Sequence, residues 1–244
     1  MRHRTGIALV IVLGAGLALC GPVLSGAKEA QKAEKQLPVV FKEDFEKGQP
    51  LEKWEPMDPA QWKIETDGET KVLSLHKKGS KYRPKVRSPH NFALIKDLWL
   101  SDFVMDLKMK STTRPYGHLD LCLFFGHQDP THFYYVHMAP RPDAAAHSIF
   151  AVDNKPRVSI VKKRNKGIVW GEKWHHVRLV RKVADGTVEV YFDDMKKPIM
   201  TTQDKRFAWG RVGVGSFDDT GLFDDIKIRG TKVEPPKKPK DEPR

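Results

Sequence analysis

The sequence predicts an all-β protein built from two stacked antiparallel sheets. About a dozen short segments rich in β-branched and aromatic residues recur along the chain, separated by Gly, Pro, Asp and Asn. After the N-terminal segment, no stretch places its apolar residues at the 3.6-residue spacing of an amphipathic helix. Several segments instead alternate apolar and polar residues, which is typical of strands that bury one face.

The N-terminus has the order of a secretory signal peptide. Arg2 and Arg4 precede the apolar run 6–20, and Ser25-Gly26-Ala27 supplies small residues for cleavage. We expect residues 1–27 to be removed and the protein to be secreted, periplasmic or bound to the cell envelope. No membrane span is then expected.

Two anchored forms are the alternatives. Cys20 suggests a lipoprotein, which is less favoured because Leu19 stands where a small residue usually precedes the lipid-modified cysteine. An uncleaved membrane anchor is also less favoured, because the apolar run is shorter than the ~20 residues that a span prefers. Cleavage leaves Cys122 as the one cysteine, so no intrachain disulfide is expected.

The remaining chain predicts one folded domain between two polar segments. Residues 28–38 are charged and offer no apolar face, so they predict a linker. Residues 231–244 are rich in Pro and basic side chains and predict a disordered tail. The domain should therefore span residues 39–230, with no internal repeat, and we expect a monomer.

The net charge is strongly positive. Loss of Arg2 and Arg4 with the signal peptide lowers it from +12 to +10. Such a charge suits an acidic polysaccharide, an anionic cell envelope or nucleic acid, or it is a solvated basic surface without a specific anionic partner. A glycan, neutral or acidic, is the partner that we favour, and nucleic acid is not expected.

The strands are expected along the whole domain. In chain order they cover residues 39–45, 62–65, 72–76, 102–110, 119–125, 133–138, 148–152, 157–162, 174–183, 187–193, 211–217 and 221–229. The segment 174–193 shows the alternation clearly, and Asp185-Gly186 marks the turn between its two strands.

The central hairpin carries the candidate binding site. Its strands, 119–125 and 133–138, are joined through Gly126 and Pro130. Leucines face one side of the first strand, whereas titratable side chains face the other side and need partners or a ligand. The expected ligand-binding residues are His118, Asp120, Tyr135 and His137, with Arg114 nearby and Trp170 as an aromatic platform at the rim.

Three segments, 41–46, 174–193 and 210–230, resemble the concanavalin A-like lectin and glucanase superfamily, which includes laminin G-like domains. The resemblance covers nearly all of the domain and implies a two-sheet jelly-roll sandwich. More loosely, the chain resembles secreted domains linked to keto-disaccharide hydrolysis. Because members include lectins, hydrolases, lyases and adhesion modules, the resemblance implies a fold and leaves the function to be argued from a site.

We expect the protein to bind carbohydrate on its concave sheet. The alternatives are a glycoside hydrolase or polysaccharide lyase acting on a modified sugar, and a protein-binding adhesion module. A histidine beside a carboxylate suits proton transfer, but no histidine spacing predicts a zinc site. Glu65, Asp67 and Glu69 match the alternating carboxylates of family 16 hydrolases, although Asp67-Gly68 is a turn signal where that chemistry needs a rigid strand.

Calcium is a candidate cofactor in a structural role, and the alternative is that the acids named below lie on a solvated edge. In a jelly roll the first and last strands often pair, and related sandwiches often hold a calcium ion near that pairing. This resemblance implies a ligand set of Asp44, Glu46, Asp224 and Asp225. Asp218 and Asp219 form a weaker alternative set.

Overall fold

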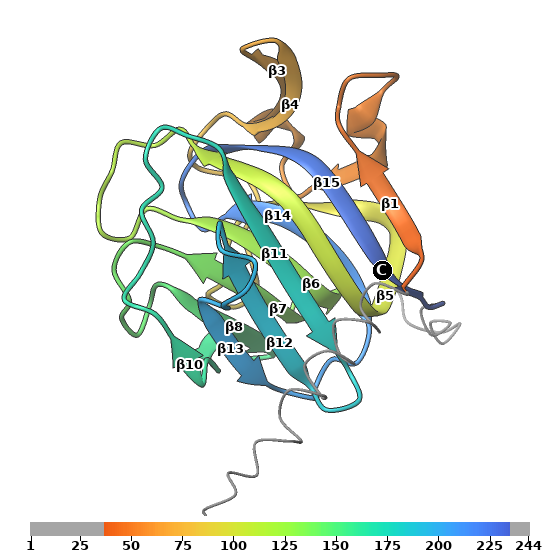
Figure 1. Ribbon diagram of the computed structural model, residues 1–244, viewed down its shortest axis with the longest axis vertical. Helices are drawn as coiled ribbons and strands as arrows, with labels where there is room; N and C mark the ends of the chain where they lie inside the picture. The colour runs from red at the N-terminus through yellow and green to blue at the C-terminus, as the bar shows by residue number, and fades with distance from the viewer. Residues whose placement is uncertain (1–36, 235–244) are drawn as a thin grey trace, which may run out of the picture. The chain divides into compact units, whose positions relative to one another are not determined.

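Two antiparallel sheets that share one long strand, β5 (Asn91–Ser111), form the molecule. The computed structural model describes residues 37–234, and Figure 1 shows β11 (His175–Lys182) and β15 (Gly221–Lys232) in front of the strands of the other sheet. The predicted signal peptide, nearly all of the linker and the end of the tail lie outside the described residues. Residues 37–234 contain no helix that is long and apolar enough to span a membrane.

The pairing partners of β5 change along its length. Its first part pairs with β14 (Gly210–Ser216) up to Leu100, whereas residues 103–109 pair with β11 and residues 100–111 pair with β15. The strand is irregular before this change: Asp97 has a φ of 51°, and the register with β14 shifts between Arg211 and Gly213. A bulge of this kind bends a strand and increases its twist, which lets β5 pass from one sheet to the other.

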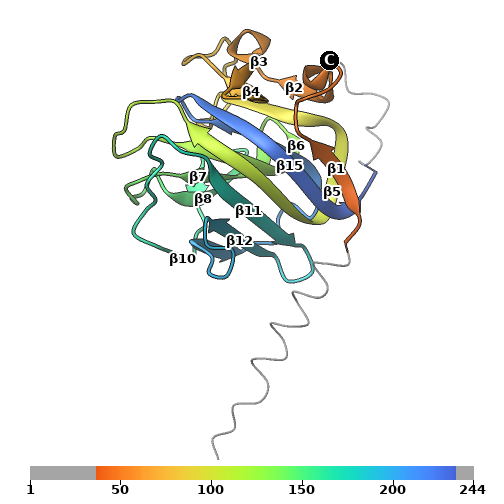
Figure 2. The ribbon, with the colours of Figure 1, turned by 45° about the horizontal axis from the view of Figure 1, so that its top comes forward.

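We name each sheet after one of its strands. The β11 sheet contains, in order, β10 (Lys163–Arg164), β13 (Met200–Gln203), β12 (Thr187–Phe192), β11, the second part of β5, and β15. The other edge of β15 pairs with β1 (Val39–Glu43) and with β4 (Thr70–Leu75), and β4 pairs in turn with β3 (Trp62–Asp67). The β7 sheet contains β2 (Trp54–Pro56), the first part of β5, β14, β6 (Leu121–Asp129), β7 (His132–Met138), β8 (Ser148–Asp153) and β9 (Val158–Ser159). Two short 3₁₀ helices, Pro50–Lys53 and Pro59–Gln61, flank β2 (Figure 2).

The main core lies between the sheets and confirms the alternation seen in the sequence. Leu121, Leu123 and Phe125 of β6 are fully buried in it, together with Val177 and Leu179 of β11. Because side chains alternate across a strand, Cys122 and Phe124 point to the opposite face of the β7 sheet.

That opposite face carries a second apolar cluster, which the sequence does not predict. It consists of Phe92, Leu94, Cys122, Phe124, Phe133, Tyr135, Phe150 and Val152. Partly buried Met57, Tyr82 and Val86 pack against it. The β7 sheet is therefore covered on both faces, in contrast to the single buried face expected of the central hairpin.

The predicted strands agree with the observed ones in most places. The first and last strands pair as expected, with Lys42 opposite Lys227. The sequence misses the first part of β5 and the short strands β2, β10 and β13, which lack a clear alternation. The fold also extends past residue 230, because β15 continues to Lys232 and the Val233 N–H donates to the Trp99 carbonyl over 2.9 Å.

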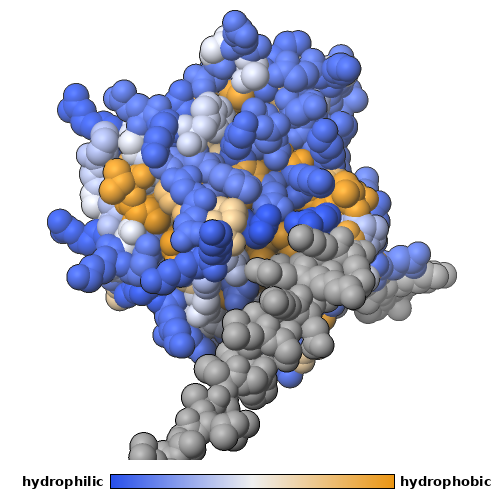
Figure 3. Space-filling model, viewed as in Figure 1, coloured by the Kyte–Doolittle hydropathy of each residue, from blue (hydrophilic) through white to orange (hydrophobic). Residues whose placement is uncertain are grey.

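The surface shown in Figure 3 is mostly hydrophilic, with separate apolar patches. Five large hydrophobic residues are exposed within residues 37–234, namely Val39, Leu51, Tyr116, Val158 and Val169. Tyr116 is the one aromatic residue among them.

The close fit of β14 between β5 and β6 leads to a prediction. A Cβ atom on Gly215 would lie 2.2 Å from the Asn91 carbonyl oxygen and 2.6 Å from the Phe92 Cα. Gly215→Ala should lower the free energy of unfolding by about 1–3 kcal/mol or more, because backbone on a shared strand must move. Urea denaturation measures this change. Gly117→Ala is the control, because its Cβ would meet only the Arg141 side chain at 3.5 Å, and an equal loss in both variants would contradict the prediction.

Candidate functional site

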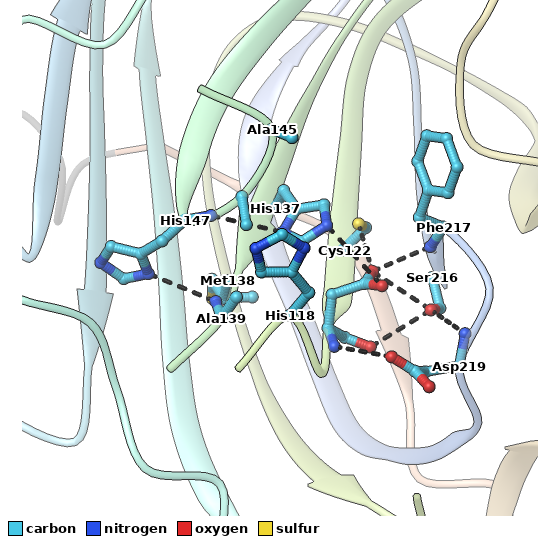
Figure 4. A network of polar contacts seen from close by, with 12 residues as sticks. His118, Cys122, His137, Met138, Ala139, Ala145, His147, Ser216, Phe217 and Asp219 are labelled. Carbon is cyan, nitrogen blue, oxygen red and sulfur yellow. Dashed lines mark hydrogen bonds and ion pairs between the residues drawn. The ribbon is translucent and has the colours of Figure 1, made fainter. Parts of the chain in front are cut away.

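The central hairpin brings Asp120 and His137 together, as the alternation predicts. The residues are neighbours because Cys122 lies opposite His137 in the register of β6 and β7. His137 Nε2 lies 3.7 Å from Asp120 Oδ1, and both side chains are almost fully buried. Figure 4 shows that the polar network continues from His137 and Cys122 to the loop that carries Ser216, Phe217 and Asp219.

Asp120 is the centre of this network. Its Oδ2 accepts hydrogen bonds from Cys122 Sγ at 3.0 Å, Ser216 Oγ at 3.1 Å and the Phe217 N–H at 2.8 Å. Its own N–H donates to Asp219 Oδ2 at 3.0 Å. Burial, together with the nearby charge of Asp219, raises the pKa of Asp120 to about 6 despite these hydrogen bonds.

His137 stays neutral inside the protein. Burial, reinforced by the positive charge of Arg157, lowers the pKa of His137 to about 3. Arg157 donates to the Tyr135 hydroxyl at 2.7 Å and lies over the rings of Phe150 and Phe217, with its guanidinium carbon 4.7 and 4.4 Å from their centroids. The guanidinium therefore packs over this part of the β7 sheet.

The burial of these residues corrects the expected binding face. Asp120, Tyr135 and His137 are at most 4% exposed, so they present no surface to a glycan. Tyr135 belongs to the second apolar cluster, against which Tyr82 and Val86 pack from the segment after β4, and the His137 ring meets Phe150 of that cluster edge-on. His118 does reach the surface, where its Nε2 lies 2.5 Å from Asp143 Oδ2.

Trp170 also differs from its expected role. The ring is 1% exposed, its Nε1 donates to the Met138 carbonyl at 3.2 Å, and its edge meets the His175 ring. It is therefore part of the core and not a platform at a rim. The sequence could not separate these roles, because a tryptophan in a sandwich loop suits both.

An open pocket lies beside the buried network, at the end of β5. We call it the Arg114 pocket. It has a volume of about 550 Å³ and is lined by His76, Lys78, Thr112, Thr113, Arg114, Pro115, Tyr116 and Thr220. Arg114 is exposed and makes no hydrogen bond or ion pair within residues 37–234.

Asp219 joins the Arg114 pocket to the buried network. Its Oδ2 accepts a hydrogen bond from the Tyr116 hydroxyl at 2.6 Å, and its Oδ1 accepts one from Lys78 Nζ at 2.9 Å. The Tyr116 ring is 45% exposed, and Lys78 Nζ lies 5.9 Å from its centroid. One buried carboxylate therefore fixes the orientation of an exposed aromatic ring.

A second pocket, of about 630 Å³, lies under the loop that contains Trp170. Val169, which is 79% exposed, and Phe192 contribute to its lining. His175, which also lines this pocket, has both ring nitrogens occupied, by Asp193 Oδ2 at 2.8 Å and by the Trp170 carbonyl. No ring nitrogen of this histidine remains for a ligand.

The acids expected to bind calcium have protein partners. Asp225 pairs with Lys108 at 2.7 Å, Glu46 accepts a hydrogen bond from the Lys71 N–H at 2.9 Å, and Asp44 accepts one from the Glu46 N–H at 3.4 Å. Burial and the adjacent Asp225 raise the pKa of Asp224 to about 6.

Within residues 37–234, the expected calcium set is not among the groups of three or more acids whose oxygens lie within 4.8 Å of one another. The group with that spacing is Asp120, Asp218 and Asp219, which includes the weaker alternative pair.

The acids that match the hydrolase pattern have structural contacts. Asp67 Oδ2 accepts hydrogen bonds from Lys110 Nζ and Trp174 Nε1, both at 2.9 Å, and Glu65 pairs with Lys63. Gly68 and Glu69 form the turn between β3 and β4, as the turn signal predicts.

Comparison with solved structures shows the fold. The carbohydrate-binding module CBM66 from Bacillus subtilis aligns with a TM-score of 0.52 and 18% identity, over 73% of this chain and 96% of the module. A protein of unknown function with a galectin-like fold, also from Bacillus subtilis, aligns with a TM-score of 0.56 and 11% identity, over 80% and 97% of the two chains. A GH43 protein from Bacillus licheniformis aligns with a TM-score of 0.55 and 12% identity, over 78% of this chain and 39% of the GH43 protein.

These alignments agree with the predicted all-β, concanavalin A-like sandwich. No protein-family model and no curated protein matches the sequence. At such low identities the alignments show the fold alone.

The buried histidines lead to a prediction about pH. His127 stacks on Phe133 with 5.2 Å between ring centroids, and burial, with Arg211 nearby, lowers its pKa from 6.5 to about 4. As pH falls below 6.5 the unfolded chain binds a proton first, so stability is full above that pH and is lost toward pH 4. Between about pH 7.5 and about pH 5, the wild type should lose about 2 kcal/mol more than His127→Phe.

Urea unfolding at the two pH values tests this. The raised pKa values of Asp120 and Asp224 act in the opposite direction, but they act equally in both proteins and cancel in the comparison. Parallel losses in the wild type and the variant would contradict a buried, neutral His127.

Proposed function

We propose that the protein is a secreted carbohydrate-binding domain that holds a glycan in the Arg114 pocket. The observation that carries the proposal is Tyr116, the one exposed aromatic residue within residues 37–234, which lies in a pocket lined by hydroxyl and cationic side chains. The sandwich folds of the aligned carbohydrate-binding module and galectin-like protein support this function.

The pocket has the chemical groups that a sugar needs. A tyrosine ring offers a flat apolar face to the C–H groups of a pyranose, and its polar tip stays hydrogen-bonded. Thr112, Thr113 and Thr220 offer hydroxyls next to the ring, and Arg114 offers free N–H donors to sugar oxygens.

The ring is held in place before any ligand arrives. Because Tyr116 donates to Asp219 at 2.6 Å, binding need not restrict a mobile side chain, and less conformational entropy is lost. The Thr112 and Thr113 hydroxyls also lie 2.8 and 3.0 Å from the Thr220 hydroxyl, and these contacts fix that part of the lining.

The pocket replaces the face of the β7 sheet as the proposed place of binding. The titratable residues on that face are covered, whereas Arg114, from the same predicted set, lies at the surface. The hydrolase alternative would need two carboxylates that reach a sugar. Of the three acids close together, only Asp218 is exposed, so binding without turnover is the better supported function.

Substitution of Tyr116 tests the proposal. Tyr116→Ala should weaken glycan binding at least tenfold, or about 1.4 kcal/mol, because the stacking surface is lost. Tyr116→Phe keeps the ring and loses the hydrogen bond to Asp219, so it should show a smaller loss. Affinity gel electrophoresis on a panel of neutral and acidic polysaccharides identifies the ligand, and calorimetry then measures the dissociation constants.

Val169→Ala is the matched control, because it removes an exposed apolar side chain from the other pocket. Retention on no polysaccharide, or equal affinities of Tyr116→Ala and the wild type, would refute glycan binding in the Arg114 pocket. New reducing ends or unsaturated products after incubation with oligosaccharides would favour the enzyme alternative.

A further inference from the structure

Three carboxylates converge below the Arg114 pocket. Asp120, Asp218 and Asp219 each offer an oxygen, and these oxygens all lie within 4.8 Å of one another. Calcium binds carboxylate oxygens at about 2.3–2.6 Å, so oxygens on opposite sides of one ion lie up to about 5 Å apart. Within residues 37–234 this is the one group of His, Cys, Asp or Glu side chains with such spacing.

A buried oxygen that accepts no hydrogen bond points to a ligand. Asp120 is 0% exposed, and its Oδ1 has no hydrogen-bond partner, whereas its Oδ2 accepts three hydrogen bonds. A buried carboxylate oxygen without a partner costs free energy, and a cation is the partner that removes this cost most fully.

The charges around the group are unbalanced. In the described part of the chain, the lysine or arginine that forms an ion pair with this group is Lys78, which pairs with Asp219. The Lys78 side chain is 56% exposed. The nearest histidine is His137, whose Nε2 lies 3.7 Å from Asp120 Oδ1.

The group is both anchored and accessible. The loop is fixed by the Phe217 N–H on Asp120 and by the Asp219 N–H, which donates to Ser216 Oγ at 2.7 Å (Figure 4). Asp218 lies between these two anchors and is exposed, so an ion can arrive from solvent.

We propose that Asp120, Asp218 and Asp219 bind a divalent cation of the hard, oxygen-preferring kind, with Ca²⁺ as the best match. Two of the ligands are buried and one closes the site from the solvent side. Water completes the coordination, and Lys78 moves from Asp219 into solvent when the ion binds. This site differs from the Asp44, Glu46, Asp224 and Asp225 set, and it does not depend on glycan binding.

Calorimetric titration of the metal-free full chain with CaCl₂ tests the proposal, with MgCl₂ and MnCl₂ as comparisons. The wild type should bind one Ca²⁺ and melt at a higher temperature in its presence, because an ion bound only by the native state stabilises it. Asp218→Asn should raise the dissociation constant for Ca²⁺ at least tenfold. Because Asp218 is exposed, this variant should keep its fold, which circular dichroism checks.

Asp225→Asn is the matched control, because it removes the same charge from the other acid set and should leave Ca²⁺ binding unchanged. Terbium luminescence is a second readout, since a Tb³⁺ ion bound at Asp219 would lie near the Tyr116 ring and be sensitised by it. The proposal fails if none of the three cations gives heat or a melting shift, if Asp218→Asn binds like the wild type, or if Asp225→Asn abolishes binding.

Discussion

The passage of β5 from one sheet to the other is the constraint on which the rest of the structure depends. Its first part supports β14 and the whole β7 sheet, and its second part supports β11 and β15. Because β14 must lie between β5 and β6, it is built with Gly213 and Gly215, where a Cβ would meet the β5 backbone at 2.2 Å. The pairing of β14 with β6 then places the loop after Ser216 beside the start of the central hairpin, with Gly215 opposite Cys122.

The site follows from that placement through a series of hydrogen bonds. Asp120 is too deeply buried to remain charged at low cost, and the Phe217 N–H and the Ser216 hydroxyl partly compensate its burial. The same contacts fix the loop, so that Asp219 accepts hydrogen bonds from Asp120, Tyr116 and Lys78 at once. Strand pairing in the sandwich thus determines the orientation of an exposed tyrosine.

Alternation along strands predicted the parts of this structure that depend on local sequence. The leucine face of β6 and the neighbouring Asp120 and His137 are where the pattern places them. The cover over the second face could not be predicted in this way. Tyr82 and Val86 stand alone among basic residues, and the cluster against which they pack is gathered from four strands, β5, β6, β7 and β8. The three-acid group was also hidden, because only the pairing of β14 with β6 joins Asp120 to Asp218 and Asp219.

The buried polar network is better understood as a support than as a surface for binding. A residue that contacts a sugar must be accessible, whereas Asp120 and His137 are buried. Burying these two polar side chains costs free energy, and a satisfied polar network compensates by holding neighbouring groups in one arrangement. What it fixes is Asp219, which holds Tyr116 and Lys78 on one side and belongs to the three-acid group on the other. An ion at those acids would act on the same carboxylate that orients the ring, so cation and glycan would share one supporting residue.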